Sequence, residues 1–130
     1  MTAIMASVVQ NYRPQIRAAL RYACGTDGRP THTVDDVIEM VETDLAQCWP
    51  GPRSVIITEV IDRPRRRVLH FFLAGGVMRE LEAMTPLILE WGVTQGCDSA
   101  SLIGRKGWER SFLARTGWSR NDSILMEKML

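Results

Sequence analysis

Two segments rich in β-branched and aromatic residues, 54–61 and 67–74, are separated by the sequence Asp-Arg-Pro-Arg-Arg. Residues of these types favour strands, and a short charged turn containing proline between two such segments is typical of a β-hairpin. Two adjacent glycines, Gly75 and Gly76, then interrupt the second segment. The pattern therefore predicts an antiparallel pair of strands in the middle of the chain.

The segment that follows the glycines predicts a crossover. Leu81, Met84, Ile88 and Trp91 recur at helical spacing, so we expect a helix over residues 77–95, kinked by Pro86. A short strand is expected at 99–103. A strand, a helix and another strand in succession favour parallel pairing, so the fold class is α/β with a mixed sheet and helices on both faces.

The remaining segments complete the predicted order ααββαβαβ. Residues 13–24 and a segment that starts at Thr33 and stops before Trp49 have the apolar spacing of helices. The apolar face of the second helix comprises Val34, Val37, Ile38, Val41 and Leu45. We expect a short helix at 106–116 and a closing strand around 124–128, and leave open whether residues 2–10 form a strand or lead into a helix.

Length and charge restrict the class of protein. A chain of 130 residues with 45% hydrophobic positions is expected to form one domain, 1–130. A net charge of +1 argues against nucleic-acid binding by the molecule as a whole.

No apolar stretch approaches the ~20 residues of a membrane span, and we expect neither a membrane protein nor a secreted one. The three cysteines, Cys24, Cys48 and Cys97, lack the spacing of a metal site and suggest buried thiols in a reducing compartment.

The C-terminal part carries a family resemblance. The run Phe112-Leu113-Ala114-Arg115-Thr116-Gly117-Trp118 resembles the closing motif of the GCN5-related N-acetyltransferase (GNAT) superfamily, in which a short helix ends in a glycine–aromatic pair before the last strands. The order of the preceding helices and strands is similar as well. The resemblance implies a GNAT-like fold with a reduced number of strands.

The same resemblance locates a cofactor loop and catalytic residues. The family binds acetyl-CoA through a Gln/Arg-x-x-Gly-x-Gly/Ala loop at the start of its long helix, and here that place is taken by Gly75, Gly76 and Arg79. Many members place a tyrosine, as a general acid, where this chain has Leu113. Glu59 and His70 are the acid/base candidates in the two central strands.

These departures predict a function without catalysis. The adjacent glycines are typical of a simple turn, Leu113 has no proton to donate, and residues 54–74 have room for two strands where the family has three. We therefore expect a degenerate GNAT-like protein without a cofactor.

The run Gly104-Arg105-Lys106-Gly107-Trp108 resembles small GNAT-like proteins of tailed bacteriophages, which implies a structural or assembly role in the virion or the host cytoplasm. The alternative is an acetyl-CoA-dependent N-acetyltransferase that uses Glu59 or His70 as base.

Two clusters are candidates for contacts with other proteins or with further copies of this chain. Arg65, Arg66 and Arg67 crowd the hairpin turn, where a solvated turn is the ordinary explanation. Arg105, Lys106 and Trp108 combine cations with an aromatic ring, although packing of Trp108 against the sheet is the simpler interpretation. The sequence contains no hydrolase triad motif and no phosphate-binding P-loop.

Overall fold

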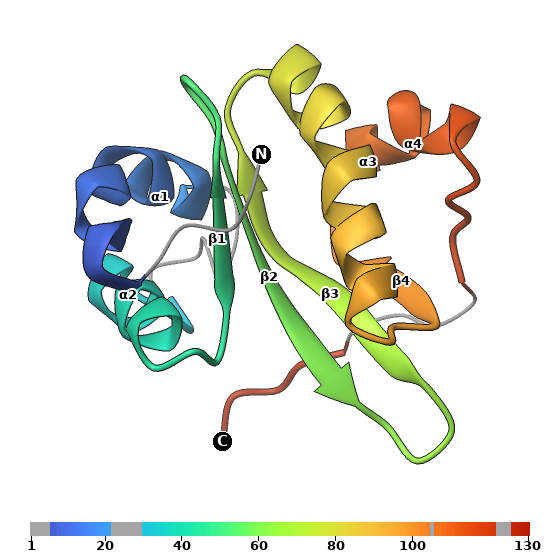
Figure 1. The fold of residues 1–130 in the computed structure, drawn as a ribbon, viewed down its shortest axis with the longest axis horizontal. Coiled ribbons are helices and arrows are strands. Elements are labelled where there is room, and N and C mark those ends of the chain that lie inside the picture. The colour runs from blue at the N-terminus through green and yellow to red at the C-terminus, as the bar shows by residue number, and fades with distance from the viewer. Residues whose placement is uncertain (1–5, 22–29, 105, 122–125) are drawn as a thin grey trace.

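The computed structural model of the chain describes residues 6–21, 30–104, 106–121 and 126–130. In chain order its elements are η1 (Ala6–Tyr12), α1 (Arg13–Leu20), α2 (Val34–Glu42), β1 (Gln47–Pro50), β2 (Val55–Asp62), β3 (Arg67–Gly75), α3 (Met78–Thr94), β4 (Ser99–Leu102), η2 (Lys106–Arg110) and α4 (Phe112–Arg115). Helices lie on both sides of a central sheet (Figure 1), which confirms the predicted fold class.

The sheet has four strands in the order β1-β2-β3-β4. β1, β2 and β3 are antiparallel, whereas β3 and β4 run parallel across the crossover helix α3. The predicted hairpin and crossover are therefore confirmed. Pairing between β2 and β3 shifts by one residue between Ile57 and Thr58, which leaves Phe72 without a partner as a β-bulge.

Each face of the sheet packs against its own hydrophobic core. One core includes Ile16 of α1, Val37 and Ile38 of α2, and Ile57 of β2. The other core lies beneath α3 and α4, and its buried residues are Trp49, Ile56, Leu69, Phe71, Leu81, Met84, Ile88, Phe112 and Leu113. Alternate residues of β2 enter opposite cores because successive side chains of a strand point to opposite faces.

Local sequence explains where the helices begin. Thr33 caps α2 in a reciprocal capping box, in which its hydroxyl accepts from the Asp36 amide and the Asp36 carboxylate accepts from the Thr33 amide. Pro14 lies in the first turn of α1, where the missing amide hydrogen costs nothing. No helix in the described part of the chain combines the length and hydropathy needed to cross a bilayer.

Three sequence predictions need correction. The prediction of two strands before the long helix is wrong, because the four-residue strand β1 makes a third. The second helix ends at Glu42, so Leu45 lies outside it and is 67% exposed. The segment predicted as one helix at 106–116 forms η2 and α4 instead.

The two ends of the chain also differ from the prediction. Ala6–Tyr12 form a 3-10 helix, while residues 2–5 lie outside the described residues. Of the closing strand predicted around 124–128, residues 126–128 are not in a strand and residues 124–125 lie outside the described residues. The first helix ends at Leu20, with Arg21 as its C-cap, and residues 22–24 of its predicted range lie outside the described part.

Candidate functional site

A row of three polar side chains crosses the centre of the sheet. Glu59 on β2 lies opposite His70 on β3, and His70 lies opposite Ser101 on β4. Directly opposed residues of an antiparallel pair have Cβ atoms about 5 Å apart. The Nδ1 atom of His70 lies 2.9 Å from the Ser101 hydroxyl oxygen. The structure thus brings together the two acid/base candidates of the sequence and adds a serine that the sequence did not single out.

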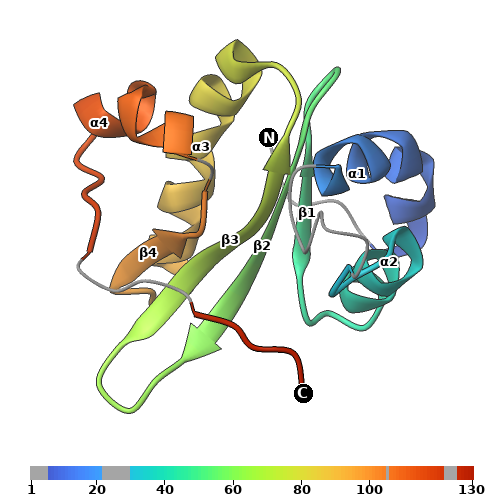
Figure 2. The same ribbon diagram turned by 180° about the vertical axis from the view of Figure 1, so that it is seen from behind.

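This row lies at the border of the surface that α1 and α2 cover. Ile57, two residues before Glu59 on the same strand, belongs to the core beneath α1 and α2, so Glu59 shares that face of the sheet. Figure 2 shows that the half of β2 and β3 nearest their turn extends beyond both helices. Glu59, His70 and Ser101 are half-buried. These side chains are thus not fully enclosed, although in Figure 2 the C-terminal segment 126–130 passes across this half of the strands.

The surroundings of His70 favour its neutral form. Burial lowers the pKa of His70 because the charged imidazolium loses solvation, and the charge of Arg63 lowers it further. The Glu59 carboxylate acts in the opposite direction, without reversing the shift. In the tautomer whose Nδ1–H donates to Ser101, the Nε2 atom keeps its lone pair. In that tautomer His70 has the neutral ring and the unprotonated nitrogen that a general base requires.

The turn between β3 and α3 is closed by protein atoms. A Cβ added at Gly75 would lie 2.7 Å from the Cα and Cβ atoms of Ala19, so α1 approaches the end of β3 too closely for any side chain. Gly76 has φ +126°, and a Cβ there would lie 2.4 Å from the Ser54 hydroxyl oxygen. Both glycines thus permit close packing within the chain and leave no room beside them for a ligand.

Ser54 and Glu80 fasten this turn to the loop before β2. The Ser54 hydroxyl accepts from the Val77 amide at 2.9 Å and donates to the Glu80 carboxylate at 2.7 Å. The same carboxylate oxygen accepts from the Arg53 amide. These hydrogen bonds lower the pKa of Glu80 because they stabilise its charged form. The partners lie more than 20 residues apart in the sequence, so no local motif indicated the contact.

The first turn of α3 retains free donors. Within the described residues, the Met78 and Arg79 amides have no hydrogen-bond acceptor, as is usual for the first amides of a helix. The Arg79 side chain is exposed and forms no ion pair with a described residue. Amides at a helix N-terminus next to an arginine suit an anion such as a phosphate. Of the three cofactor candidates, Arg79 is therefore the one whose functional groups are available.

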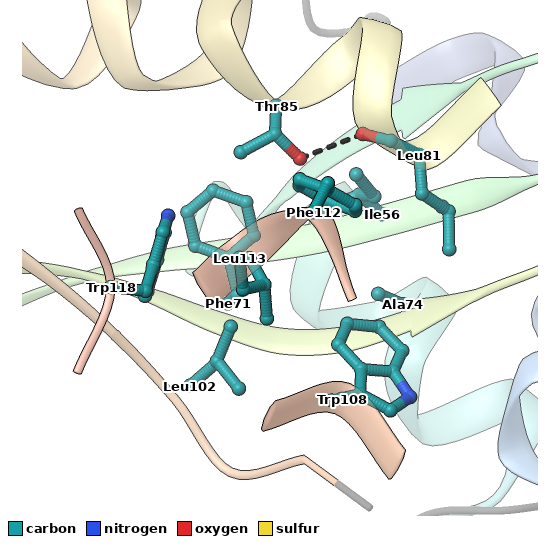
Figure 3. Close-up of a pocket in the computed structure, with 10 residues that line it drawn as sticks. All are labelled: Ile56, Phe71, Ala74, Leu81, Thr85, Leu102, Trp108, Phe112, Leu113 and Trp118. Carbon is teal, nitrogen blue, oxygen red and sulfur yellow. Dashed lines mark hydrogen bonds between the residues drawn. The ribbon is translucent and has the colours of Figure 1, made fainter. Parts of the chain in front are cut away.

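The strands β3 and β4 separate beside this turn and leave a crevice. Their pairing ends at Phe71 and Leu102, whereas β3 continues to Gly75. Next to this separation, on the sheet face beneath α3 and α4, ten side chains line the crevice (Figure 3); they are the apolar Ile56, Phe71, Ala74, Leu81, Leu102, Trp108, Phe112, Leu113 and Trp118, with the hydroxyl-bearing Thr85. The remaining cavity is about 10 Å³, the space of one water molecule. The crevice is therefore occupied by the protein itself.

Trp108 and Leu113 are two of the side chains that fill the crevice. Trp108 packs against the core that contains Ala74 and Leu102, and its buried Nε1 atom has no hydrogen-bond partner in the described part of the chain. Leu113, at the position of the family's tyrosine, is 6% exposed. A buried hydrocarbon cannot act as a general acid. The position of Trp108 agrees with the packing interpretation of this residue.

The other interaction candidates lie apart from the crevice. Arg65 and Arg66 are exposed at the hairpin turn, where the Arg63 amide donates to the Arg66 carbonyl. The Arg67 Nε atom lies 3.7 Å from a carboxylate oxygen of Asp62, an exposed pair that contributes little to stability. Arg105 lies outside the described residues, as does the side chain of Lys106. The structure thus gathers the hairpin arginines into one cluster.

The described cysteines have no catalytic surroundings. Cys48 is buried on β1, and burial raises the pKa of its thiol to about 12, so the thiol stays protonated. Cys97 is half-buried and also free. Cys24 lies outside the described residues. Among the residues that are described, no cluster of three His, Cys, Asp or Glu side chains is placed to hold a metal ion.

Three solved structures with the same fold are acetyltransferases. The ribosomal-protein-alanine N-acetyltransferase of Brucella melitensis biovar Abortus 2308 is 8% identical, with a TM-score of 0.71 over 98% of this chain and 98% of that chain. A GCN5-related N-acetyltransferase of Ralstonia eutropha JMP134 is 15% identical, with a TM-score of 0.66 over 98% and 96%. An acetyltransferase of Trypanosoma brucei is 10% identical, with a TM-score of 0.66 over 98% and 97%.

These similarities establish the fold. The chain has a GNAT-like fold, with a small mixed sheet of four strands. No family model matches the sequence, and no curated protein matches it either. Because the identities to the solved structures lie between 8% and 15%, the likeness extends to the fold alone.

Residues at the start of α3 suit one part of acetyl-CoA, its diphosphate. The free amides of Met78 and Arg79 and the Arg79 side chain suit a diphosphate. The crevice is too full for a pantetheine arm, because ligand pockets typically measure several hundred cubic ångströms and this cavity measures about 10 Å³. Trp108 lines the cavity together with Ala74 and Leu102, and movement of its indole would enlarge the space.

Proposed function

We propose that this protein is an acyl-CoA-dependent N-acyltransferase, with acetyl-CoA as the donor to test first. The observation that carries the proposal is the row of Glu59, His70 and Ser101 on the accessible part of the sheet face. It lies on the strands that separate next to the start of α3. The fold shared with acetyltransferases of known structure supports the same function.

In this proposal His70 is the general base. Acetyl-CoA supplies the acyl group as a thioester; the C–N bond forms as the C–S bond breaks, and the amine loses a proton. The Nε2 atom of His70 accepts that proton, Ser101 holds the ring through Nδ1, and the Glu59 carboxylate stabilises the imidazolium. Leu113 is buried hydrocarbon, so the departing thiolate takes its proton from solvent.

The first experiment measures whether the full chain binds the donor. Acetyl-CoA at 100 times its dissociation constant stabilises a folded protein by about 2.7 kcal/mol, which raises the melting temperature by several degrees. The proposal expects such a shift with acetyl-CoA and with CoA, and release of free CoA thiol when a panel of amines is added. Absence of both the shift and thiol release at millimolar acetyl-CoA, from wild type and from a Trp108→Ala variant, would refute it.

A second candidate is a non-catalytic structural or assembly protein, as in the virion of a tailed bacteriophage. The filled crevice, the glycines packed against Ala19 and Ser54, and Leu113 in place of an acid favour this function. Its partners would be other virion proteins or further copies of the same chain. The variant Trp108→Ala separates the two candidates, because an open crevice that still ignores acetyl-CoA favours the assembly role.

A further inference from the structure

Three arginines at the β2–β3 turn have side chains without an ion-pair partner among the described residues. Arg63, Arg65 and Arg66 are exposed, and none forms an ion pair with a described carboxylate. Arg67 differs, because its guanidinium lies near Asp62 and its amide donates to the Asp98 carboxylate at 3.0 Å. We call Arg63, Arg65 and Arg66 the turn cluster. Three positive charges on one short turn repel each other unless anionic groups neutralise them.

The turn cluster lies within reach of His70. The register pairs Asp62 with Arg67, three residues from His70, and a strand rises about 3.4 Å per residue. The cluster is therefore on the order of 10–15 Å from the imidazole, the length of three or four extended residues. Arg63 directly follows the last residue of β2, at the start of the turn. Burial is the main cause of the lowered pKa of His70, and the charge of Arg63 adds to it.

We propose that the turn cluster binds carboxylates of an acidic peptide and thereby presents a nearby amine of that peptide to His70. This inference rests on the proposed acyl transfer and names its substrate class. An amine is itself cationic at neutral pH, so the turn cluster repels an amine that carries only positive charge. Carboxylates a few residues from the amine reverse that interaction, because arginine forks hold carboxylates in paired hydrogen bonds.

The observations favour a peptide over a nucleic acid. Proteins that bind duplexes neutralise several phosphates along an extended surface, whereas this cluster comprises three side chains on one turn. The whole chain carries a net charge of only +1. Extended peptides also match the accessible half of β2 and β3, which continues from the turn toward Glu59 and His70 (Figure 2).

The experiment compares three peptides of equal length with one N-terminal amine. Positions two to four carry Asp and Glu in the first, Asn and Gln in the second, and Lys in the third. Acetyl transfer is followed by release of CoA thiol, and binding by fluorescence polarisation of peptides labelled at the C-terminus. We expect the acidic peptide to have a KM at least about tenfold below that of the neutral peptide and the basic peptide to be the poorest, with the acidic advantage decreasing as salt rises.

Paired variants identify the residues. Arg65→Ser/Arg66→Ser is expected to remove the acidic preference through KM while kcat stays unchanged, because these side chains only recruit the substrate. The control Arg17→Ser/Arg21→Ser removes the same charge from the exposed side of α1 and should leave the preference intact. Equal KM values for acidic and neutral peptides, an unaltered preference in the turn variant, or stronger competition by a DNA duplex would overturn the inference.

The same data separate this inference from the proposed function. Acetyl transfer without preference among the peptides leaves the function standing and rejects the substrate class. Arginine-dependent binding of the acidic peptide in a protein that ignores acetyl-CoA rejects catalysis and supports the turn cluster as a recognition surface.

Discussion

The two faces of β3 differ in what they offer another molecule. On the face shared with α1 and α2, His70 is half-buried, flanked by Glu59 and Ser101, and near the charged turn. On the face beneath α3 and α4, Leu69 and Phe71 are enclosed by apolar side chains, and only about 10 Å³ remains empty. One face is thus polar and accessible, whereas the other is apolar and full.

This difference indicates that entry of the acyl donor, and not proton acceptance by His70, limits the proposed reaction. Proton acceptance requires only groups that are already paired across β2, β3 and β4. Admission of a thioester arm requires that Trp108 leave a packed crevice, while the closed glycine turn stays in place. Variants of the accessible face should therefore change turnover, and variants of the filled side should change stability and donor affinity.

The largest effect is expected from His70→Gln. Loss of a general base typically lowers the rate by about 10²- to 10⁴-fold, so kcat should fall by that amount with the melting temperature little changed. Ser101→Ala only loosens the ring and should cost about tenfold. Glu90→Gln, on the exposed side of α3, is the control and should retain full activity. Wild-type kcat in His70→Gln would remove the accessible face from the mechanism.

Gly76→Ala tests the closed turn on the filled side. A methyl group there would meet the backbone carbonyl of Arg53 at 2.6 Å and the Ser54 hydroxyl at 2.4 Å, in a backbone conformation that alanine avoids. We expect the free energy of unfolding to fall by about 3 kcal/mol in urea titrations. Gly107→Ala, with no neighbour within 4 Å, should stay within about 0.5 kcal/mol of wild type. Equal stability of the two variants would show that the turn rearranges around the added methyl group at little cost in free energy.

Trp108→Ala tests the crevice. Removal of a half-buried indole should lower the free energy of unfolding by about 2 kcal/mol, because the surrounding side chains lose contacts. The same change should tighten acetyl-CoA binding by about tenfold, measured by calorimetry. Trp91→Ala is the control: its ring packs edge-on against Trp49 at 5.3 Å and does not line the crevice. Unchanged donor affinity in Trp108→Ala would place the coenzyme elsewhere or exclude it.

The sequence predicted the parts whose order along the chain determines their place. The hairpin was predicted because its two strands and turn are consecutive in the chain, and its observed register, with Asp62 opposite Arg67, places Glu59 opposite His70. Ser101 was missed because its register depends on how the 17-residue helix α3 returns the chain to the sheet. β1 was missed because its four residues, ending in Trp49 and Pro50, are too few to show an alternating pattern.

The smallest expected effect is a displacement of the pH profile. Because His70 has a lowered pKa, the acid limb of kcat/KM that His70 sets should lie below pH 6.5, where the imidazole becomes charged, and be separate from the titration of the peptide amine at about pH 8. The unfolded chain binds that proton first, so the stability contributed by neutral His70 is present above pH 6.5 and is lost as pH falls toward the folded pKa.

Two substitutions should move this profile in opposite directions. Glu59→Gln removes the charge that raises the pKa of His70, so the acid limb of kcat/KM should shift to lower pH. Arg63→Gln removes a charge that lowers it, so the limb should shift to higher pH. The neutral peptide is the substrate for this measurement, because it does not depend on the turn cluster. Parallel shifts in both variants would mean that the titrating group is not His70, and the imidazole resonances of His70 followed by NMR would decide the assignment.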